Sequence, residues 1–334
     1  MNHTDSLMET LLSLASHLSD ETWIESHLSD SISLQSKLNT WFTPRFCKQS
    51  LLSLGDFISH SSKIGQALQK NNPEPKKIAV ATHNTTPLDS FYDLFVVLSA
   101  GHTYIGKLKH NDNILFMKLC DIIIEDNPEL QDRITFTDKL NDFDAVIIDT
   151  DGQTQASLEK YFSNTPHIFR VPGSAAAVLD GSESDAGLRG LSRDIYSYFG
   201  RSNYSVRMLF VPENYDFVPL LGILSQESRF LEEHNQFLNN LDYQKSINLM
   251  GQRPYLDAGT FIFAESDGLF PPTSVVHYSR YHNSDEIKTA LNANRDSVSK
   301  VIAKGGKNVF GSAHQMRVDS MRHIDETLKL LEII

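Results

Sequence analysis

Lys77-Ile78-Ala79-Val80-Ala81-Thr82 is a short run of small apolar and β-branched residues, and it opens a repeating series of elements. Pro87 can occupy the start of a helix, and residues 88–100 continue that helix. Gly101 stands where a helix C-cap glycine belongs, and a second strand pattern follows at 102–108. This order of strand, helix and strand predicts a parallel sheet covered by helices on both faces.

The alternation of strands and helices continues toward the C-terminus, whereas the first 70 residues show helical patterns only. Strands are predicted at 133–137, 144–149, 167–171, 175–179, 205–211, 259–264, 273–281 and 297–303. Helices are predicted at 112–126, 153–163, 185–199, 215–225, 229–250 and 285–294. The tail, 319–334, predicts a helix or a strand. The first 70 residues predict helices, because leucines at spacings of three and four share one face: Leu7, Leu11, Leu12, Leu14 and Leu18.

Length and charge limit the class of protein. The chain has 334 residues, which predicts two lobes rather than one core. Its net charge of -12 repels phosphate, so we expect neither nucleic acid nor an anionic membrane surface as a partner. We also expect no membrane span and no secretory signal. The two cysteines, Cys47 and Cys120, lie far apart, which predicts a cytoplasmic protein without a disulfide framework.

The residues alone contain no self-evident catalytic set. The thirteen histidines form no H-x-x-x-H pair and no cysteine cluster exists, so we expect no metal site. Gly305-Gly306-Lys307 is interpreted as a turn, because the rest of a phosphate-binding loop is missing. Cys120, on the apolar face of a helix, predicts a buried and inert thiol. Cys47 follows Phe46 in a predicted loop that contains a proline, and it could be exposed.

Ser202 and Ser205 lie in a loop that precedes the predicted strand at 205–211. A serine nucleophile needs a histidine base and an oxyanion hole. The G-x-S-x-G elbow is absent, since Gly200-Arg201-Ser202-Asn203-Tyr204 lacks the second glycine. Ordinary loop serines are the favoured interpretation, and catalysis by either serine is the less favoured one.

Framework segments from about Asn39 to the C-terminus carry a family resemblance. The strongest is Tyr198-Phe199-Gly200, followed by Val206 and by the run 209–217. Others are Trp41-Phe42-Thr43-Pro44, Pro87-Leu88, Ser99-Ala100-Gly101-His102, Asp142-Phe143-Asp144-Ala145-Val146-Ile147, Pro166-His167-Ile168, Ala177-Val178-Leu179-Asp180-Gly181 and Asn240-Leu241-Asp242-Tyr243. In this order the chain resembles the LuxC-type acyl-CoA reductases, a family similar in architecture to aldehyde dehydrogenases.

The resemblance implies an α/β, aldehyde dehydrogenase-like fold with a parallel-sheet nucleotide-binding-type domain and a smaller α/β catalytic-type domain. The expected divisions are an N-terminal helical region at 1–75, the nucleotide-binding-type domain at 76–195, the catalytic-type domain at 196–303 and a C-terminal return at 304–334. The family reaction passes an acyl group from coenzyme A to a cysteine thiolate, and hydride from NADPH then releases the aldehyde.

The motifs that carry this chemistry have changed here. The nucleophile position falls on Asn203, and a carboxamide cannot form the acyl intermediate. Thr85 takes the position of an asparagine that resembles the oxyanion-binding one of aldehyde dehydrogenases, with Asn84 beside it as a substitute.

The cofactor motif has also changed. In the loop near the cofactor phosphates, Thr150-Asp151-Gly152 places a carboxylate where an anion would sit, which opposes pyrophosphate binding. Lys107 matches a family lysine that resembles the ribose-binding one, and it favours NADPH.

The leading hypothesis is a catalytically degenerate LuxC-type protein that keeps the fold. It would bind an acyl chain, an acyl-CoA thioester or a protein partner, and regulate or scaffold an active paralogue. One alternative is an active NADPH-dependent reductase with unusual chemistry. Another is an acyl transferase or hydrolase that uses Ser202 or Ser205. A homo-oligomer is also possible, because the C-terminal run 328–334 is apolar.

Overall fold

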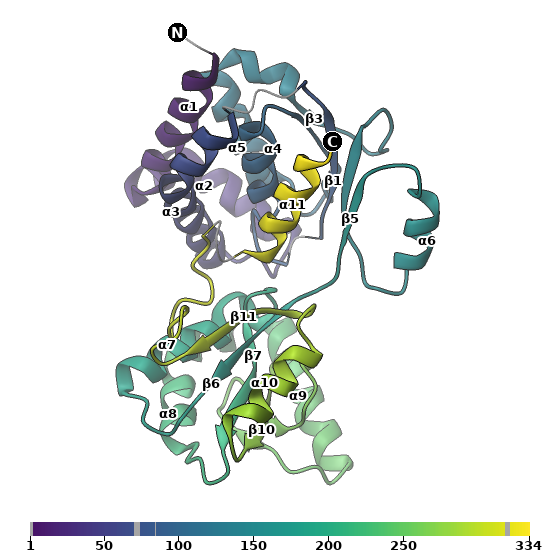
Figure 1. Cartoon of the computed structure of the whole chain (residues 1–334). Helices are drawn as coiled ribbons and strands as arrows, with labels where there is room; N and C mark the ends of the chain where they lie inside the picture. Colours follow the sequence, from purple (N-terminus) through teal and green to yellow (C-terminus); the bar gives the residue numbers. More distant parts are fainter. Residues whose placement is uncertain (1–2, 70–73, 84, 318–320) are drawn as a thin grey trace. The chain divides into compact units, whose positions relative to one another are not determined.

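The computed structural model describes residues 3–69, 74–83, 85–317 and 321–334. The chain divides into two compact units, as its length predicts. Unit 1 contains Met1–Pro172 and Met316–Ile334, and unit 2 contains Gly173–Gln315. Each unit has its own sheet (Figure 1).

Unit 1 is built on a five-stranded parallel sheet in the order β3-β2-β1-β4-β5. Its strands are β1 (Lys77–Ala81), β2 (Thr103–Gly106), β3 (Ile134–Phe136), β4 (Ala145–Asp149) and β5 (His167–Arg170). The strand residues Ile78, Ala79 and Val80 are buried, because a parallel sheet is covered on both faces. On one face, Ala79 and Val146 pack with Phe162, which follows α6 (Gln155–Tyr161).

The helices of unit 1 are α1 (His3–Leu18), α2 (Glu21–Leu38), α3 (Pro44–Gln69), α4 (Phe91–Ser99), α5 (Ile114–Asp126), the short α6 and α11 (Arg322–Glu332), with the 3-10 turn η1 (Pro128–Arg133) before β3. The predicted N-terminal helices are therefore confirmed. Leu7, Leu11, Leu14 and Leu18 are buried as predicted, whereas Leu12 is 37% exposed and lies off the apolar face.

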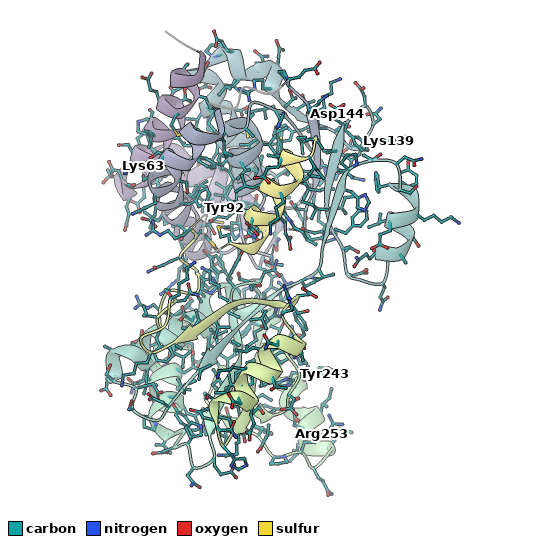
Figure 2. All side chains as sticks on the ribbon, in the orientation of Figure 1. Lys63, Tyr92, Lys139, Asp144, Tyr243 and Arg253 are labelled. Atoms are coloured by element: carbon teal, nitrogen blue, oxygen red, sulfur yellow. The ribbon has the colours of Figure 1, made fainter. Side chains whose placement is uncertain are left out.

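The C-terminal helix α11 belongs to unit 1 and packs against α4 and β5. A buried ion pair joins β5 to α4 beside it: the guanidinium nitrogens Nη1 and Nη2 of Arg170 each lie 2.8 Å from a carboxylate oxygen of Asp93, and Nη2 also donates to the carbonyl oxygen of His323 in α11 at 2.9 Å. Thr327 of α11 donates to the same carboxylate at 3.0 Å. Tyr92, labelled in Figure 2, makes an edge contact with His323 of α11, with ring centroids 6.2 Å apart.

Unit 2 is built on a six-stranded sheet in the order β11-β6-β7-β10-β9-β8. Its strands are β6 (Ser174–Val178), β7 (Val206–Pro212), β8 (Leu256–Asp257), β9 (Ile262–Glu265), β10 (Val275–Tyr281) and β11 (Val298–Ala303). All neighbouring pairs are parallel except β8 with β9.

The helices of unit 2 are α7 (Asp185–Tyr196), α8 (Val218–Glu227), α9 (Asn235–Met250) and α10 (Ser284–Ala293), with the 3-10 turns η2 (Ser197–Gly200) and η3 (Arg229–Glu233). Ile287 of α10 packs on Met208 and Phe210 of β7. Leu241 of α9 packs on Ile262 and Val275.

The boundary between the units differs from the one expected near residue 195. The predicted strand at 175–179 and the helix after it lie in unit 2, because β6 pairs with β7 and β11. The C-terminal return begins at Met316 rather than at residue 304. The segment before it is held in unit 2 by Asp194, whose carboxylate accepts the N–H groups of Gly311 and Ala313 at 2.7 and 2.9 Å.

Candidate functional site

Asn203, the expected nucleophile position, lies in the loop between η2 and β7. Its side chain is half-buried, and its Oδ1 accepts a hydrogen bond at 3.1 Å from the backbone N–H of Gly173. Gly173 is buried and immediately precedes β6, where an added Cβ would meet Ser299 at 1.9 Å. The carboxamide therefore ties the loop to the first residue before a central strand of unit 2.

The two serines of the same loop are buried, and both brace the backbone. The Oγ of Ser202 accepts the N–H of Tyr204 at 3.1 Å. The hydroxyl of Ser205 donates to the carbonyl oxygen of Ser197 at 3.3 Å. Ser202 is 1% exposed and Ser205 is fully buried. These are the contacts of loop-stabilising side chains rather than of an activated nucleophile, which needs a histidine partner.

Both thiols of the sequence lie in the core of unit 1. Cys47, in α3, is fully buried, so the expectation that it could be exposed is wrong. Its Sγ donates to the carbonyl oxygen of Phe42 at 3.3 Å, and burial raises the pKa of the Cys47 thiol to about 12. Cys120 is buried in α5 as predicted, and burial raises the pKa of its thiol well above the ordinary range. Neither thiol is a nucleophile near neutral pH, because the thiolate is the reactive form.

The carboxyl edge of the unit 1 sheet is where an open α/β fold places ligands, at the point where the strand order reverses. Here that point lies between β1 and β4. Directly after β1, the N–H of His83 donates at 2.8 Å to Asp149, the last residue of β4. Burial raises the pKa of the Asp149 carboxyl to about 7.

Thr85, the expected oxyanion position, is held by a neighbouring carboxylate. Its N–H and its hydroxyl both donate to Asp89 at 3.0 Å. The N–H of Thr86 donates to the same carboxylate oxygen at 3.0 Å, and the Thr86 hydroxyl binds the other oxygen. Asn84, the expected substitute, lies outside the described residues. Thr85 therefore offers its donors to an internal anion.

In the loop after β4, a carboxylate likewise accepts hydrogen bonds from residues of its own loop. Asp151 Oδ1 accepts the N–H groups of Gln153 and Thr154 at 3.0 and 3.1 Å, and the Thr154 hydroxyl at 3.0 Å. These hydrogen bonds, above all from Thr154, lower the pKa of the Asp151 carboxyl. Gly152 adopts a φ of 81° that favours glycine, and its N–H lies 3.3 Å from the Thr150 hydroxyl oxygen.

The residues at this edge do not fit the phosphates of NADPH. A dinucleotide site offers backbone N–H groups and positive charge to the pyrophosphate. Here carboxylates accept those N–H groups, and the helix that follows, α6, has only seven residues. Lys107 lies exposed directly after β2, at the same edge, and is the one expected cofactor residue whose charge suits a phosphate.

Sequence reasoning missed Asp89 and Asp149. A signal for Asp89 exists, because Thr86-Pro87-Leu88-Asp89 has the spacing at which a hydroxyl residue and an acidic residue exchange hydrogen bonds at a helix start. The signal for Asp149 is weaker, because it consists only of a carboxylate at the end of an apolar strand.

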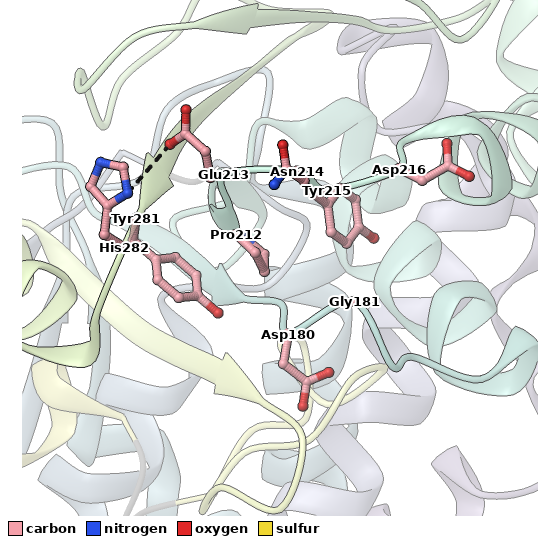
Figure 3. Close-up of a pocket in the computed structure, with 9 residues that line it drawn as sticks. All are labelled: Asp180, Gly181, Pro212, Glu213, Asn214, Tyr215, Asp216, Tyr281 and His282. Atoms are coloured by element: carbon pink, nitrogen blue, oxygen red, sulfur yellow. Dashed lines mark ion pairs between the residues drawn. The ribbon is translucent and has the colours of Figure 1, made fainter.

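Unit 2 has a separate pocket of about 480 Å³ beyond the carboxyl ends of β7 and β10 (Figure 3). Several of its polar groups are paired within the unit. Glu213 lies 3.7 Å from the Nδ1 atom of His282, and the hydroxyl of Tyr281 donates to the carbonyl oxygen of Leu179 at 2.8 Å. Asp216 accepts the N–H of Val218 at 3.0 Å, at the start of α8. Within the described ranges, no cluster of three or more His, Cys, Asp or Glu residues could hold a metal ion.

Comparison with known proteins gives structural matches only. No protein-family model matches the chain, and no curated protein matches it in sequence. An NAD-dependent aldehyde dehydrogenase from Sinorhizobium meliloti has a TM-score of 0.63 at 11% identity, over 98% of this chain and 72% of its own. Aldehyde dehydrogenase 21 from Physcomitrella patens, solved with the reaction product succinate, has a TM-score of 0.63 at 10% identity, over 98% and 88%.

A bifunctional proline utilization A protein matches with a TM-score of 0.62 at 14% identity, and it covers all of this chain. This chain spans 37% of that protein's length. These likenesses show the fold alone: the chain has an aldehyde dehydrogenase-like α/β fold, and the predicted fold class is confirmed. No helix in the described part of the chain combines the length and apolarity required to cross a membrane.

Proposed function

We propose that this chain is a catalytically degenerate relative of the LuxC-type acyl-CoA reductases, which acts as a binding or regulatory protein. Its ligand would be an acyl chain or an acyl-CoA thioester, and its partner an active paralogue or another protein. A reducing, cytoplasmic location is part of the proposal, because both cysteines are unpaired thiols.

The observation that carries the proposal is the role of Asn203. Acyl transfer from coenzyme A requires a sulfur nucleophile that is ionised near neutral pH and reachable by the thioester. The expected position holds a carboxamide whose oxygen accepts the Gly173 N–H. The two cysteines of the sequence, Cys47 and Cys120, are buried in the other unit with raised pKa values. These observations favour a protein that does not form the acyl-enzyme.

The serine alternative has weaker support. Ser202 and Ser205 are buried, and their hydroxyls take part in hydrogen bonds within the loop. An acyl transferase or hydrolase would need one of them exposed beside a base.

Intact-protein mass spectrometry after incubation with acyl-CoA of increasing chain length tests the proposal. We expect no acyl adduct on the unmodified protein. In Asn203→Cys, the sulfur would bond to the acyl carbon and coenzyme A would leave as its thiolate, which gives an adduct that hydroxylamine removes. Asn203→Ser is the matched control, and we expect no adduct on it.

An adduct on the unmodified protein would defeat the proposal, and its position would identify the true nucleophile. If Asn203→Cys folds but takes no acyl group at any chain length, the acyl-binding part of the proposal fails.

A further inference from the structure

The backbone N–H groups around the strand-order reversal of unit 1 are the natural anion donors of this fold. Backbone N–H groups that converge at the end of parallel strands bind phosphate because they present partial positive charge. In this chain three aspartates, Asp89, Asp149 and Asp151, accept hydrogen bonds from the N–H groups of His83, Thr85, Thr86, Gln153 and Thr154.

These carboxylates come from the loops after both strands that flank the reversal. Asp89 lies in the segment after β1, whereas Asp149 ends β4 and Asp151 follows it. Each carboxylate satisfies the donors that an incoming phosphate would need. A ligand phosphate would have to displace internal carboxylates in the loops after both β1 and β4, which costs the hydrogen bonds already made.

Charge adds to this steric and hydrogen-bonding competition. Asp151 is exposed and hydrogen bonds lower the pKa of its carboxyl, so it is ionised at neutral pH. A negative charge that already accepts the N–H groups of Gln153 and Thr154 repels an anionic ligand that approaches them. By contrast, burial raises the pKa values of Asp89 and Asp149, so Asp151 is the main source of negative charge.

We propose that the carboxyl groups of Asp89, Asp149 and Asp151 occupy the backbone donors of the dinucleotide phosphate site of unit 1, with the charge of Asp151 as the principal barrier to NADPH. This inference goes beyond the missing nucleophile, because it concerns binding of the cofactor rather than acyl transfer. It also holds for a chain in which a thiol is restored.

Direct titration of the full-length protein with NADPH, followed by the fluorescence of the reduced nicotinamide, tests the inference without any turnover. Asp151→Asn keeps a side-chain oxygen for the two N–H groups and removes the charge. Asp132→Asn is the matched control, because Asp132 is an exposed carboxylate in η1, which leads into the opposite, amino-terminal edge of the same sheet. Circular dichroism checks that each variant is folded.

We expect no saturable binding by the unmodified protein or by Asp132→Asn at millimolar NADPH. We expect Asp151→Asn to show saturable binding, with a Kd for NADPH at least about tenfold below the lower limit measured for the unmodified protein. Micromolar binding by the unmodified protein would overturn the inference. So would a folded Asp151→Asn that gains nothing, or an equal gain in Asp132→Asn, since either result removes Asp151 as the barrier.

Discussion

At the residue scale, Asn203 stands where the proposed relationship to the acyl-CoA reductases predicts a cysteine. Asn203 cannot form a thioester, and it has a structural contact of its own, the hydrogen bond from Gly173. A catalytic thiolate must be accessible, whereas a bracing carboxamide must be held in place. The half-buried loop position of Asn203 suits the second role.

This structural role predicts the cost of removing the carboxamide. Asn203→Ala leaves the buried N–H of Gly173 without its acceptor, and we expect a loss of about 1–3 kcal/mol in the free energy of unfolding. Asn203→Asp keeps an acceptor oxygen and should retain most of the stability. Urea denaturation at neutral pH measures both variants, and an Asn203→Ala variant as stable as the unmodified protein would rule out the bracing role.

At this scale the sequence predicts some environments and not others. The burial of Cys120 follows from helical periodicity, since Leu119 and Ile123 beside it are also buried. Cys47 was misassigned because α3 begins at Pro44, so that the stretch interpreted as a loop is the first turn of a helix. The hydrogen bonds of Asn203 and Asp149 are long-range, and no local pattern encodes them.

At the scale of elements, α7 is fixed by a close approach of two backbones. Gly190, in the middle of α7, faces the segment that precedes the C-terminal return. A Cβ added at Gly190 would lie 2.7 Å from the carbonyl oxygen of Phe310, and the Gly311 backbone is equally near. Asp194, one turn further along α7, accepts two N–H groups of the same segment. Gly190 permits α7 to approach the backbone at Phe310 and Gly311, and the hydrogen bonds to Asp194 hold that segment in place.

Two glycines of the same helix therefore predict opposite responses to alanine. Gly190→Ala must displace backbone atoms, so we expect a loss of about 1–3 kcal/mol despite the better helix propensity of alanine. A Cβ added at Gly187 would meet only side chains, Phe310 at 3.4 Å and the Ser184 hydroxyl at 3.6 Å, so Gly187→Ala should be neutral or stabilising by up to about 1 kcal/mol. Thermal unfolding of the pair compares them directly, and an equal effect at both positions would contradict the close approach.

The long-range pairing of β6 explains why the boundary between the two units could not be predicted from the sequence. The strands of both sheets follow similar patterns of apolar residues, so β6 looks like a continuation of the first series. Its assignment depends on pairing with β7 and β11, which lie 28 residues and more further along the chain. Strand positions are encoded locally, whereas the sheet to which a strand belongs is decided by long-range pairing.

For the whole molecule, length and alternating elements predict two α/β units, and the structural neighbours confirm the fold at identities of 10 to 14%. Fold does not determine activity, because activity depends on the residues of a site. In unit 1 internal carboxylates accept hydrogen bonds from backbone N–H groups at the sheet edge, and in unit 2 the proposed nucleophile position holds a carboxamide. Both features support the proposal that the scaffold is retained without the reductase reaction.

The proposed loss of reductase activity is tested most directly by the rate of NADPH oxidation by the pure, unmodified protein, measured across a series of acyl-CoA chain lengths. We predict that this rate equals the rate without protein at every chain length, and that no aldehyde forms. Oxidation of NADPH that depends on acyl-CoA, with aldehyde produced in equal amount, would contradict it and require a nucleophile other than Asn203.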